Sequence, residues 1–186
     1  MEQNGKRVSR SAVFLDRDGV INQSKVVGGK PYAPRSFEKF KLMPYASESI
    51  EKLCKAGFVV IVITNQPDIG NGHISINTVN LMHKKLLKKT SISDIIMCPH
   101  SQNEECDCRK PKPTMIYQGA KKYNIDLSQS YMVGDRSSDM EAGQKAGCRT
   151  IFIERNYKNE KFSNPDLKVR SLRSATKHIL LNTKQY

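Results

Sequence analysis

The sequence lacks several features that would place it in a specialised class of protein. It has no apolar run near the roughly 20 residues that span a bilayer. Residues 1–10 lack the apolar stretch of a secretory signal, and no internal repeat or low-complexity tract occurs. We therefore expect no membrane partner and a cytoplasmic location.

Cysteine is too scarce and too irregularly spaced for a disulfide scaffold. The chain has 186 residues and five cysteines, an odd number, and it is long enough to bury a core without cross-links. Its apolar fraction of 38% and charged fraction of 26% are typical of a folded globular protein. We expect a single domain over residues 1–186, with a core at about 12–155 and cysteines that remain thiols.

Acidic residues are scarce relative to basic ones. The net charge is +13, and part of the excess lies in a basic tail at residues 156–186. A basic balance suits nucleic acid, an anionic surface or a phosphorylated small substrate, but dispersed lysines are more often a solvated face. The aromatic residues of the tail are scattered rather than interleaved with basic ones, which argues against a nucleic-acid partner.

Strand and helix patterns alternate along the chain. Apolar runs predict buried strands at 12–15, 58–66, 94–98, 131–135 and 149–154. Helical spacing predicts helices at 45–57, 76–89, 114–123, 138–147 and 171–180. Residues 24–44 are rich in Gly and Pro and predict an irregular loop with at most a short hairpin. The alternation predicts an α/β fold with a doubly wound, mainly parallel sheet.

Distinctive polar residues stand at the ends of three predicted strands. Asp16 and Asp18 follow the first strand, Thr64 ends the second, and Asp135 ends the fourth. Lys110 lies in a loop before a predicted helix. Because ligands of such sheets bind at the carboxyl ends of the strands, we expect these residues to meet there.

This set of residue types suits phosphoryl transfer. A carboxylate such as Asp16 can attack phosphorus and form an acyl phosphate, and Mg²⁺ held by Asp16 and Asp135 would relieve the repulsion between the two anions. Lys110 and Thr64 can stabilise the transferring oxygens, and Asp18 can give and take the proton. A lone D-x-D-G sequence is common in loops. Here, however, four elements occur in a fixed order, each after a predicted strand or before a predicted helix, which favours a catalytic role over a purely structural one.

Four potential metal ligands cluster in one short loop. Cys98, His100, Cys106 and Cys108 form a set that zinc accepts tetrahedrally, and four protein ligands leave no open position, so the site would be structural. The alternatives are a strained disulfide between Cys106 and Cys108, or four ordinary loop residues. A bound zinc would fix where the adjacent Arg109 and Lys110 emerge.

The motifs "FLDRDGVIN", "ITNQ", "CRKPKP" and "VGDRSSDM" together resemble those of the haloacid dehalogenase superfamily of phosphatases. The subgroup that the chain resembles contains the D-glycero-D-manno-heptose 1,7-bisphosphate 7-phosphatases and the histidinol-phosphate phosphatase domain. The resemblance implies a Rossmann-like fold with a minimal cap and a zinc-binding loop. It also implies a monomer.

The resemblance further implies residue roles. Asp16 would be the nucleophile and Asp18 the general acid and base, with Thr64 and Lys110 stabilising the phosphoryl group. Mg²⁺ would be held by Asp16, the backbone carbonyl of Asp18, and Asp135. Substrate contacts would come from Asn65, Gln66, Arg109 and Arg136, and the zinc ligands would be Cys98, His100, Cys106 and Cys108.

Two departures from the subgroup concern the substrate. Arg136 stands where heptose enzymes commonly have lysine, and "TNQPDIGNG" replaces the usual "TNQSGIARG", so that Asp68 takes the place of a glycine. His83, on a helix among lysines, is expected at the surface.

The expected function is hydrolysis of the 7-phosphate of a heptose bisphosphate in envelope heptose synthesis. The alternatives are a histidinol-phosphate phosphatase, a polynucleotide 3′-phosphatase and a non-catalytic, zinc-stapled binding module.

Overall fold

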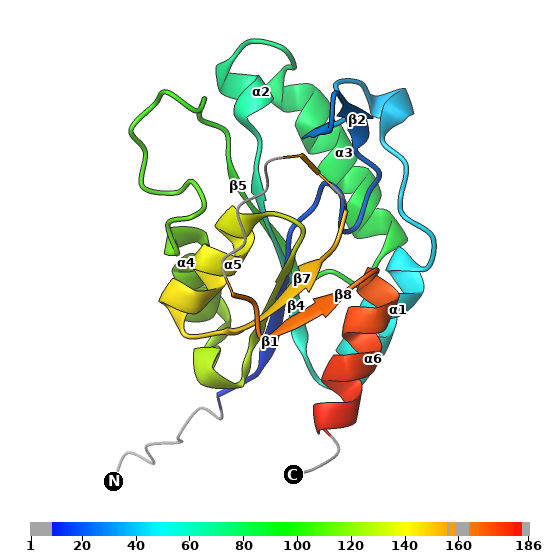
Figure 1. Cartoon of the computed structure of the whole chain (residues 1–186), viewed down its shortest axis with the longest axis vertical. Helices are drawn as coiled ribbons and strands as arrows, with labels where there is room; N and C mark the ends of the chain where they lie inside the picture. The colour runs from blue at the N-terminus through cyan, green and yellow to red at the C-terminus, as the bar shows by residue number, and fades with distance from the viewer. Residues whose placement is uncertain (1–8, 156, 159–163, 184–186) are drawn as a thin grey trace, which may run out of the picture.

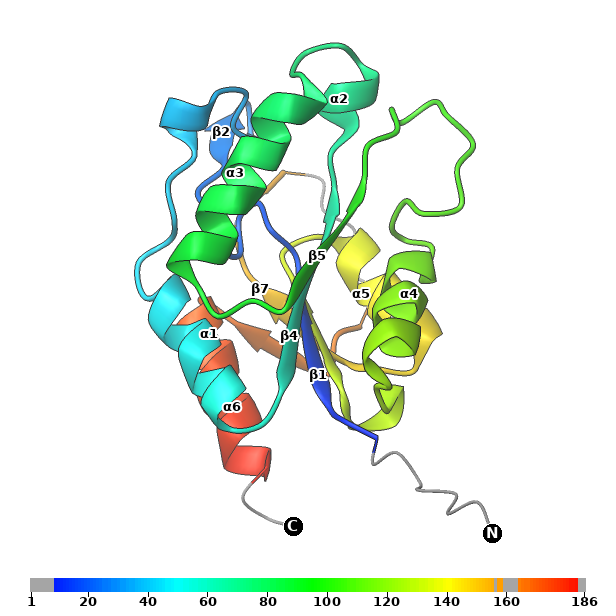
Figure 2. The same ribbon diagram turned by 180° about the vertical axis from the view of Figure 1, so that it is seen from behind.

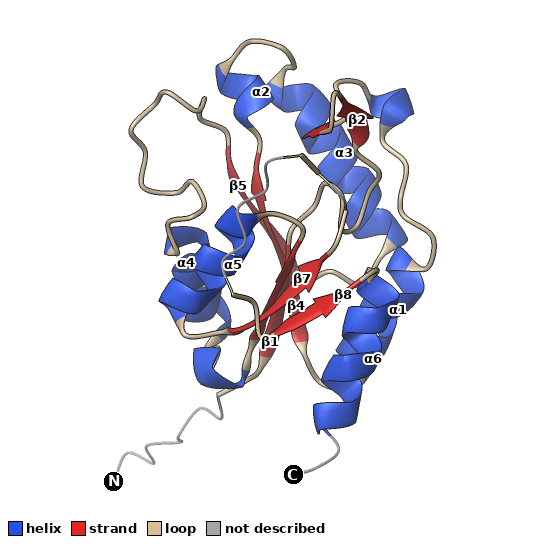
Figure 3. Cartoon of the chain, in the orientation of Figure 1, coloured by secondary structure: helices blue, strands red, loops and turns tan. Residues whose placement is uncertain are grey.

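The computed structural model describes residues 9–155, 157–158 and 164–183. The strands in this part of the chain are β1 Ala12–Leu15, β2 Lys25–Val27, β3 Lys30–Tyr32, β4 Val59–Asn65, β5 Asp94–Cys98, β6 Tyr131–Gly134, β7 Arg149–Ile153 and β8 Leu167–Val169. The main sheet has the order β5-β4-β1-β6-β7-β8 with every neighbouring pair parallel, which confirms the predicted fold class (Figures 1 and 3). β2 and β3 form a separate antiparallel hairpin.

Helices cover both faces of the sheet. They are α1 Ala46–Lys55, α2 Pro67–Gly70, α3 Ile76–Lys89, α4 Thr114–Tyr123, α5 Ser137–Ala146 and α6 Leu172–Thr183, with short 3₁₀ turns at Phe37–Lys39 and Leu127–Gln129. α1, α3 and α6 lie on one side of the sheet, and α4 and α5 lie on the other (Figures 1 and 2). None of the described helices is both long enough and apolar enough to cross a membrane.

Local signals explain where several helices begin and end. The Ser75 side chain accepts a hydrogen bond from the Thr78 backbone N–H and so caps α3. α4 ends at Asn124 and α5 at Gly147, both in the left-handed conformation that asparagine and glycine tolerate.

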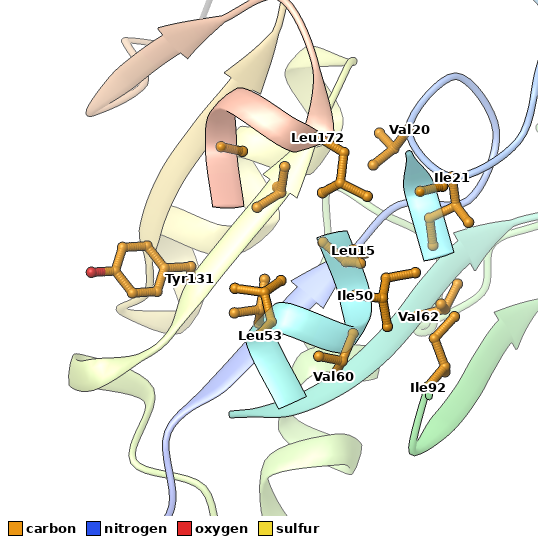
Figure 4. Packing of buried hydrophobic residues seen from close by; sticks show 14 of the residues in the cluster. Leu15, Val20, Ile21, Ile50, Leu53, Val60, Val62, Ile92, Tyr131 and Leu172 are labelled. Atoms are coloured by element: carbon orange, nitrogen blue, oxygen red, sulfur yellow. The ribbon is translucent and has the colours of Figure 1, made fainter. Parts of the chain in front are cut away.

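The alternation of side chains along the central strands divides the core in two. Val13 and Leu15 of β1 pack toward α1 and α6, whereas Ala12 and Phe14 pack toward α4 and α5. Figure 4 shows Leu15 with Ile50 and other residues of the first cluster. Because β1 and its neighbours are covered on both faces, their sequences are continuously apolar.

The chain after residue 155 contributes to this fold. β8 pairs with β7, and α6 packs against α1, with Leu172 and Ile179 buried in the core. The predicted helix at 171–180 is confirmed, whereas β8 was not predicted, because three residues are too few to show an alternation.

The strand order fixes where a ligand site can form. From β1 the chain first proceeds to β4 and β5 on one side, and then to β6, β7 and β8 on the other. Such a reversal leaves a crevice at the carboxyl ends of the central strands. The residues that follow β1, β4 and β6 therefore face one another.

Candidate active site

A cavity of about 690 Å³ opens at this edge of the sheet. Asp16 and Asp18 line it from the loop after β1, Asp135 from the end of β6, and Lys110 from the loop before α4. The structure thus brings together four residues that sequence reasoning selected from three separate segments.

Three buried carboxylates crowd the floor of the cavity. Single oxygen atoms of Asp16, Asp135 and Asp139 lie within 4.8 Å of one another, and all three residues are buried. Burial raises the pKa of Asp16 to about 7; Lys110 opposes this shift, and the charges of Asp139 and Asp18 add to it. Burial, together with Asp16 and Asp139, also holds the pKa of Asp135 well above its usual range. The site therefore concentrates more acidic groups than the single neighbouring lysine, Lys110, can neutralise.

Lys110 provides the positive charge at this floor. Its Nζ donates hydrogen bonds to Asp16 Oδ1 at 2.7 Å and to the Ile63 carbonyl at 2.8 Å. It also lies 2.6 Å from Asp139 Oδ1, an ion pair outside hydrogen-bond geometry. Burial alone would lower the pKa of Lys110, but Asp139 and Asp16 raise it above its ordinary value, so Lys110 stays charged.

A divalent cation fits this arrangement. Asp135 Oδ1 is buried and has no hydrogen-bond partner in the described part of the chain, a costly state for a carboxylate oxygen. Hard cations such as Mg²⁺ prefer carboxylate and carbonyl oxygens. Gly19 (φ +88°) permits the close approach, because a Cβ there would lie 1.9 Å from Asp135 Oδ2. These carboxylate oxygens are therefore suitable ligands for Mg²⁺.

Three side chains hold the carboxylate of Asp18. Arg17 Nη2 lies 2.9 Å from Asp18 Oδ2, Gln66 Nε2 donates to the same oxygen at 2.7 Å, and Asn22 Nδ2 donates to Oδ1 at 2.8 Å. The position of Asp18 is therefore set by residues from two different loops.

Arg17 is completely buried, and His83 of α3 supports it from behind. Arg17 Nη1 lies 3.0 Å from His83 Nε2, and the Arg17 guanidinium stacks over the Phe40 ring at 5.6 Å. Because arginine only donates, His83 Nε2 accepts this bond from a neutral ring. The expectation of a surface His83 is wrong, since only 9% of the residue is exposed.

The local pattern held a signal for this correction. The buried residues of α3 are Val79, Met82, His83 and Leu86, so His83 completes an apolar stripe with helical spacing. The flanking lysines obscured that stripe.

Replacing His83 with glutamine should make the protein less sensitive to acid. Burial, and then the charge of Arg17, lowers the pKa of His83 from 6.5 to about 4. Between these values the unfolded chain takes up a proton that the folded chain does not, so stability falls as pH falls. Between pH 7 and pH 5 the free energy of unfolding should therefore decrease by about 2 kcal/mol less in His83→Gln than in the wild type.

Denaturant unfolding at the two pH values measures this difference. His73→Gln, at an exposed loop position, is the matched control and should behave like the wild type. An equal acid dependence in His83→Gln and wild type would contradict the buried neutral histidine.

The residues that end β4 are held by protein partners. Thr64 is buried, and its Oγ1 accepts a bond from Gln66 Nε2 at 2.8 Å, which leaves the threonine O–H as a donor. Gln66 also accepts from Arg17 Nη2 at 2.8 Å, so its amide is engaged within the protein. The Asn65 side chain exchanges two hydrogen bonds of 3.1 Å with the backbone of Lys110. Asn65 thus joins β4 to the loop that carries the lysine.

Arginines lie on the rim of the cavity. Arg109 is half-buried and makes a long, 3.4 Å contact with the His100 carbonyl, whereas Arg136 is exposed and lies over the Tyr157 ring at 5.8 Å. Lys30 and Lys158 also line the cavity. Its rim is therefore basic, above an acidic floor.

The unusual Asp68 has a partner from the hairpin region. Arg35 Nε and Nη2 donate to the two oxygens of Asp68 at 2.8 and 3.0 Å. This pair joins the loop after β3 to α2, and both residues line the cavity. The residue that departs from the common motif thus forms an ion pair with Arg35.

The cysteine and histidine side chains of the loop after β5 converge. The ligand atoms of Cys98, His100, Cys106 and Cys108 lie 3.2–3.8 Å apart along the four contacts between them. Four ligands about 2.0–2.3 Å from a central zinc would be separated by similar distances in a tetrahedron. All five cysteines of the chain are free thiols, which excludes the disulfide alternative in this structure. The set fits zinc.

Comparison with known proteins gives consistent matches. The HAD-hydrolase-like family model matches residues 107–175. The D-glycero-β-D-manno-heptose-1,7-bisphosphate 7-phosphatase of Pseudomonas aeruginosa is 35% identical over 152 residues, covering 79% of this chain and 83% of that protein. The D-glycero-α-D-manno-heptose-1,7-bisphosphate 7-phosphatase of Photorhabdus laumondii is 36% identical, covering 75% of this chain and 80% of that protein. The chain belongs to this haloacid dehalogenase-like phosphatase family.

Solved structures place this phosphatase in the same fold. The D,D-heptose 1,7-bisphosphate phosphatase of B. bronchiseptica, complexed with magnesium and phosphate, has a TM-score of 0.81 at 26% identity, covering 92% of this chain and 99% of that chain. The chain is therefore a phosphoric monoester hydrolase, which rules out the alternative of a non-catalytic binding module.

Three residues of the phosphatase site escaped sequence reasoning. Arg17 lies inside the first motif but was not assigned a role, and Arg35 lies in a segment without periodicity. Tyr157 follows β7 and donates a hydrogen bond to Asp135 Oδ2 at 2.6 Å. Its place just beyond a core strand was the available signal, because the carboxyl ends of the strands meet at the site.

Proposed function

We propose that this phosphatase hydrolyses the 7-phosphate of D-glycero-D-manno-heptose 1,7-bisphosphate through a phosphorylated Asp16, acting as a monomer. The observation that carries the proposal is the contact of Asp16 with Lys110 at the floor of a cavity with a basic rim. Through Lys110 and a bound Mg²⁺ the floor would suit the phosphoryl group that is transferred, and the basic rim suits a second phosphate on the same substrate. The heptose bisphosphate relatives support this choice of substrate.

In the first step a carboxylate oxygen of Asp16 attacks phosphorus. The bond between phosphorus and the sugar oxygen breaks, and Asp18 in its protonated form gives its proton to that oxygen. Lys110 stabilises the charge on the phosphoryl oxygens, and the free O–H of Thr64 donates to one of them. The products are the dephosphorylated sugar and an acyl phosphate on Asp16.

In the second step water attacks the phosphorus of this acyl phosphate. Asp18, now a carboxylate, accepts the proton from water, and the bond between phosphorus and Asp16 breaks to release phosphate. Arg17, Gln66 and Asn22 keep Asp18 in place for both steps. Asp16, Asp135 and the Asp18 carbonyl would hold Mg²⁺, which would supply charge neutralisation between the anions.

We also propose that zinc occupies the Cys98, His100, Cys106 and Cys108 cluster as a structural ion. Cys98 is buried at the end of β5, next to β4 in the sheet, so the ion would tie the loop to the sheet. Cys108 directly precedes Arg109 and stands two residues before Lys110. A bound zinc would therefore act on catalysis through the position of these two basic side chains.

Phosphate release from a panel of substrates tests the proposal. The panel contains both anomers of the heptose 1,7-bisphosphate, histidinol phosphate and a 3′-phosphorylated oligonucleotide. We expect kcat/KM for one heptose anomer to exceed that for the other two substrate classes by at least about a hundredfold, because only the heptose carries a second phosphomonoester on the same sugar for the basic rim to bind. Equal, slow rates on all of them would contradict the proposed substrate.

A further inference from the structure

Tyr157 contacts the cation-binding floor from outside the four motifs. Its hydroxyl donates to Asp135 Oδ2 at 2.6 Å. A phenol has an ordinary pKa of about 10, so at neutral pH it carries its proton and donates it in a hydrogen bond to a carboxylate. Tyr157 is thus a permanent donor to this carboxylate.

The two oxygens of Asp135 are therefore not equivalent. Oδ2 accepts from Tyr157, whereas Oδ1 is buried without a hydrogen-bond partner among the described residues. A carboxylate free to rotate about its terminal bond could present either oxygen to a cation. The hydrogen bond from Tyr157 to Oδ2 favours the orientation in which Oδ1 is the oxygen left to bind a cation.

Neighbouring contacts hold Tyr157 at this position. A Cβ at Gly19 would lie 2.8 Å from the tyrosine hydroxyl and 1.9 Å from Asp135 Oδ2, so backbone, phenol and carboxylate meet closely. Arg155 Nε donates to the Gly19 carbonyl at 2.8 Å, and the Lys158 N–H donates to the Gly29 carbonyl at 2.9 Å. These two bonds tie the chain on either side of Tyr157 to the loops beside the cavity.

The ring of Tyr157 contacts Arg136, a candidate substrate-binding residue. The Arg136 guanidinium lies 5.8 Å from the centre of the Tyr157 ring, a distance at which a cation and an aromatic ring attract each other. Arg136 lines the cavity at its rim. A single side chain therefore touches both a cation ligand and a candidate substrate ligand.

We infer that Tyr157 is a positioning residue with two separable roles. Its hydroxyl orients Asp135 so that Oδ1 faces the cation, and its ring places Arg136 over the cavity. This inference rests on the proposed Mg²⁺-dependent phosphatase mechanism.

Two substitutions separate the roles. Tyr157→Phe retains the ring and loses the hydroxyl, so the Kd for Mg²⁺, measured by calorimetric titration of the resting protein, should rise about tenfold or more. At saturating Mg²⁺ its KM for the sugar phosphate should stay within about twofold of the wild-type value, since Arg136 keeps its ring partner. Tyr157→Ala should raise both the Mg²⁺ Kd and the KM.

Tyr123→Phe is the matched control. It removes a tyrosine hydroxyl bond of 3.1 Å to the Ser93 carbonyl, away from the cavity, and should leave Mg²⁺ binding unchanged. A wild-type Mg²⁺ Kd in Tyr157→Phe would overturn the orienting role, and a wild-type KM in Tyr157→Ala would overturn the role toward Arg136. Thermal melting of each variant reports whether it is folded.

The outcome is independent of the substrate assignment. If the wild type released no phosphate from any substrate in the panel, the proposed function would fail, yet the calorimetric comparison would still decide whether Tyr157 controls the cation site. Conversely, an active wild type with an unaltered Tyr157→Phe variant would refute only this inference.

Discussion

Replacing Asp16 with asparagine should abolish phosphate release while leaving the fold intact. The Asp16 carboxylate directly follows β1 and accepts a hydrogen bond from Lys110 on the cavity floor, where a carboxylate can form an acyl phosphate. An asparagine amide is a poor nucleophile, so kcat should fall by a factor on the order of 10⁴ or more. The rate of phosphate release at saturating Mg²⁺ measures this loss.

The same substitution should not destabilise the metal-free protein above pH 7. Burial and neighbouring carboxylates raise the pKa of Asp16 to about 7, so ionised Asp16 is less favourable in the folded state than in the unfolded chain. A neutral asparagine removes that penalty, while Lys110 retains Asp139 and the Ile63 carbonyl as partners. The thermal midpoint at pH 8 should equal or exceed that of the wild type.

Asp94→Asn is the control, because it removes a surface carboxylate paired with Lys122 and should retain full activity. Activity within tenfold of wild type in Asp16→Asn would refute the nucleophile assignment. Asp16→Ala should be equally inactive, and a difference between the two variants would point to slow conversion of asparagine back to aspartate.

The site elements that the sequence predicted share a physical origin. A parallel strand buried on both faces is continuously apolar, so a charged residue directly after it is conspicuous, as Asp16 is after β1 and Asp135 after β6. Because parallel strands present their carboxyl ends at one edge, the convergence of these residues follows from the fold class alone.

The parts that escaped prediction depend on pairings between distant segments. The contact between Arg17 and His83 joins residues 66 positions apart, and nothing in either segment alone specifies the other. Gln66 illustrates a second difficulty: an amide side chain after a strand can hydrogen-bond to a ligand or to a neighbouring side chain, and the sequence does not show which. Here it bonds to Arg17, Asp18 and Thr64.

These hidden contacts have a common consequence for the mechanism. Three residues of the proposed mechanism are each held by a partner from another segment: Asp18 by Gln66, Lys110 by Asn65, and Asp135 by Tyr157. Such cross-links fix side chains before the substrate arrives, which lowers the reorganisation needed during the reaction. In the proposed mechanism, Asp18 and Lys110 act on the phosphoryl group and Asp135 would hold the cation, while Gln66, Asn65 and Tyr157 position these three residues.

Cys108→Ser should lower both stability and turnover by removing a proposed zinc ligand. Loss of a bound ion that is normally present at a hundred to a thousand times its Kd would cost about 3 to 4 kcal/mol of unfolding free energy. Arg109 and Lys110 follow Cys108 directly, so kcat/KM should fall as their positions loosen. Mg²⁺ binding should persist, because Asp16 and Asp135 come from other elements.

Metal analysis, denaturant unfolding and phosphate release on the same preparations measure these three effects. Cys54→Ser is the matched control, since Cys54 is a free, half-buried cysteine of α1 outside the cluster. This variant should keep the zinc content and activity of the wild type. If the wild type contained no zinc and Cys108→Ser matched it in stability and turnover, the cluster would be an ordinary loop. If Cys108→Ser lost its zinc and some stability but kept wild-type turnover, zinc would stabilise the fold without positioning Lys110 for catalysis.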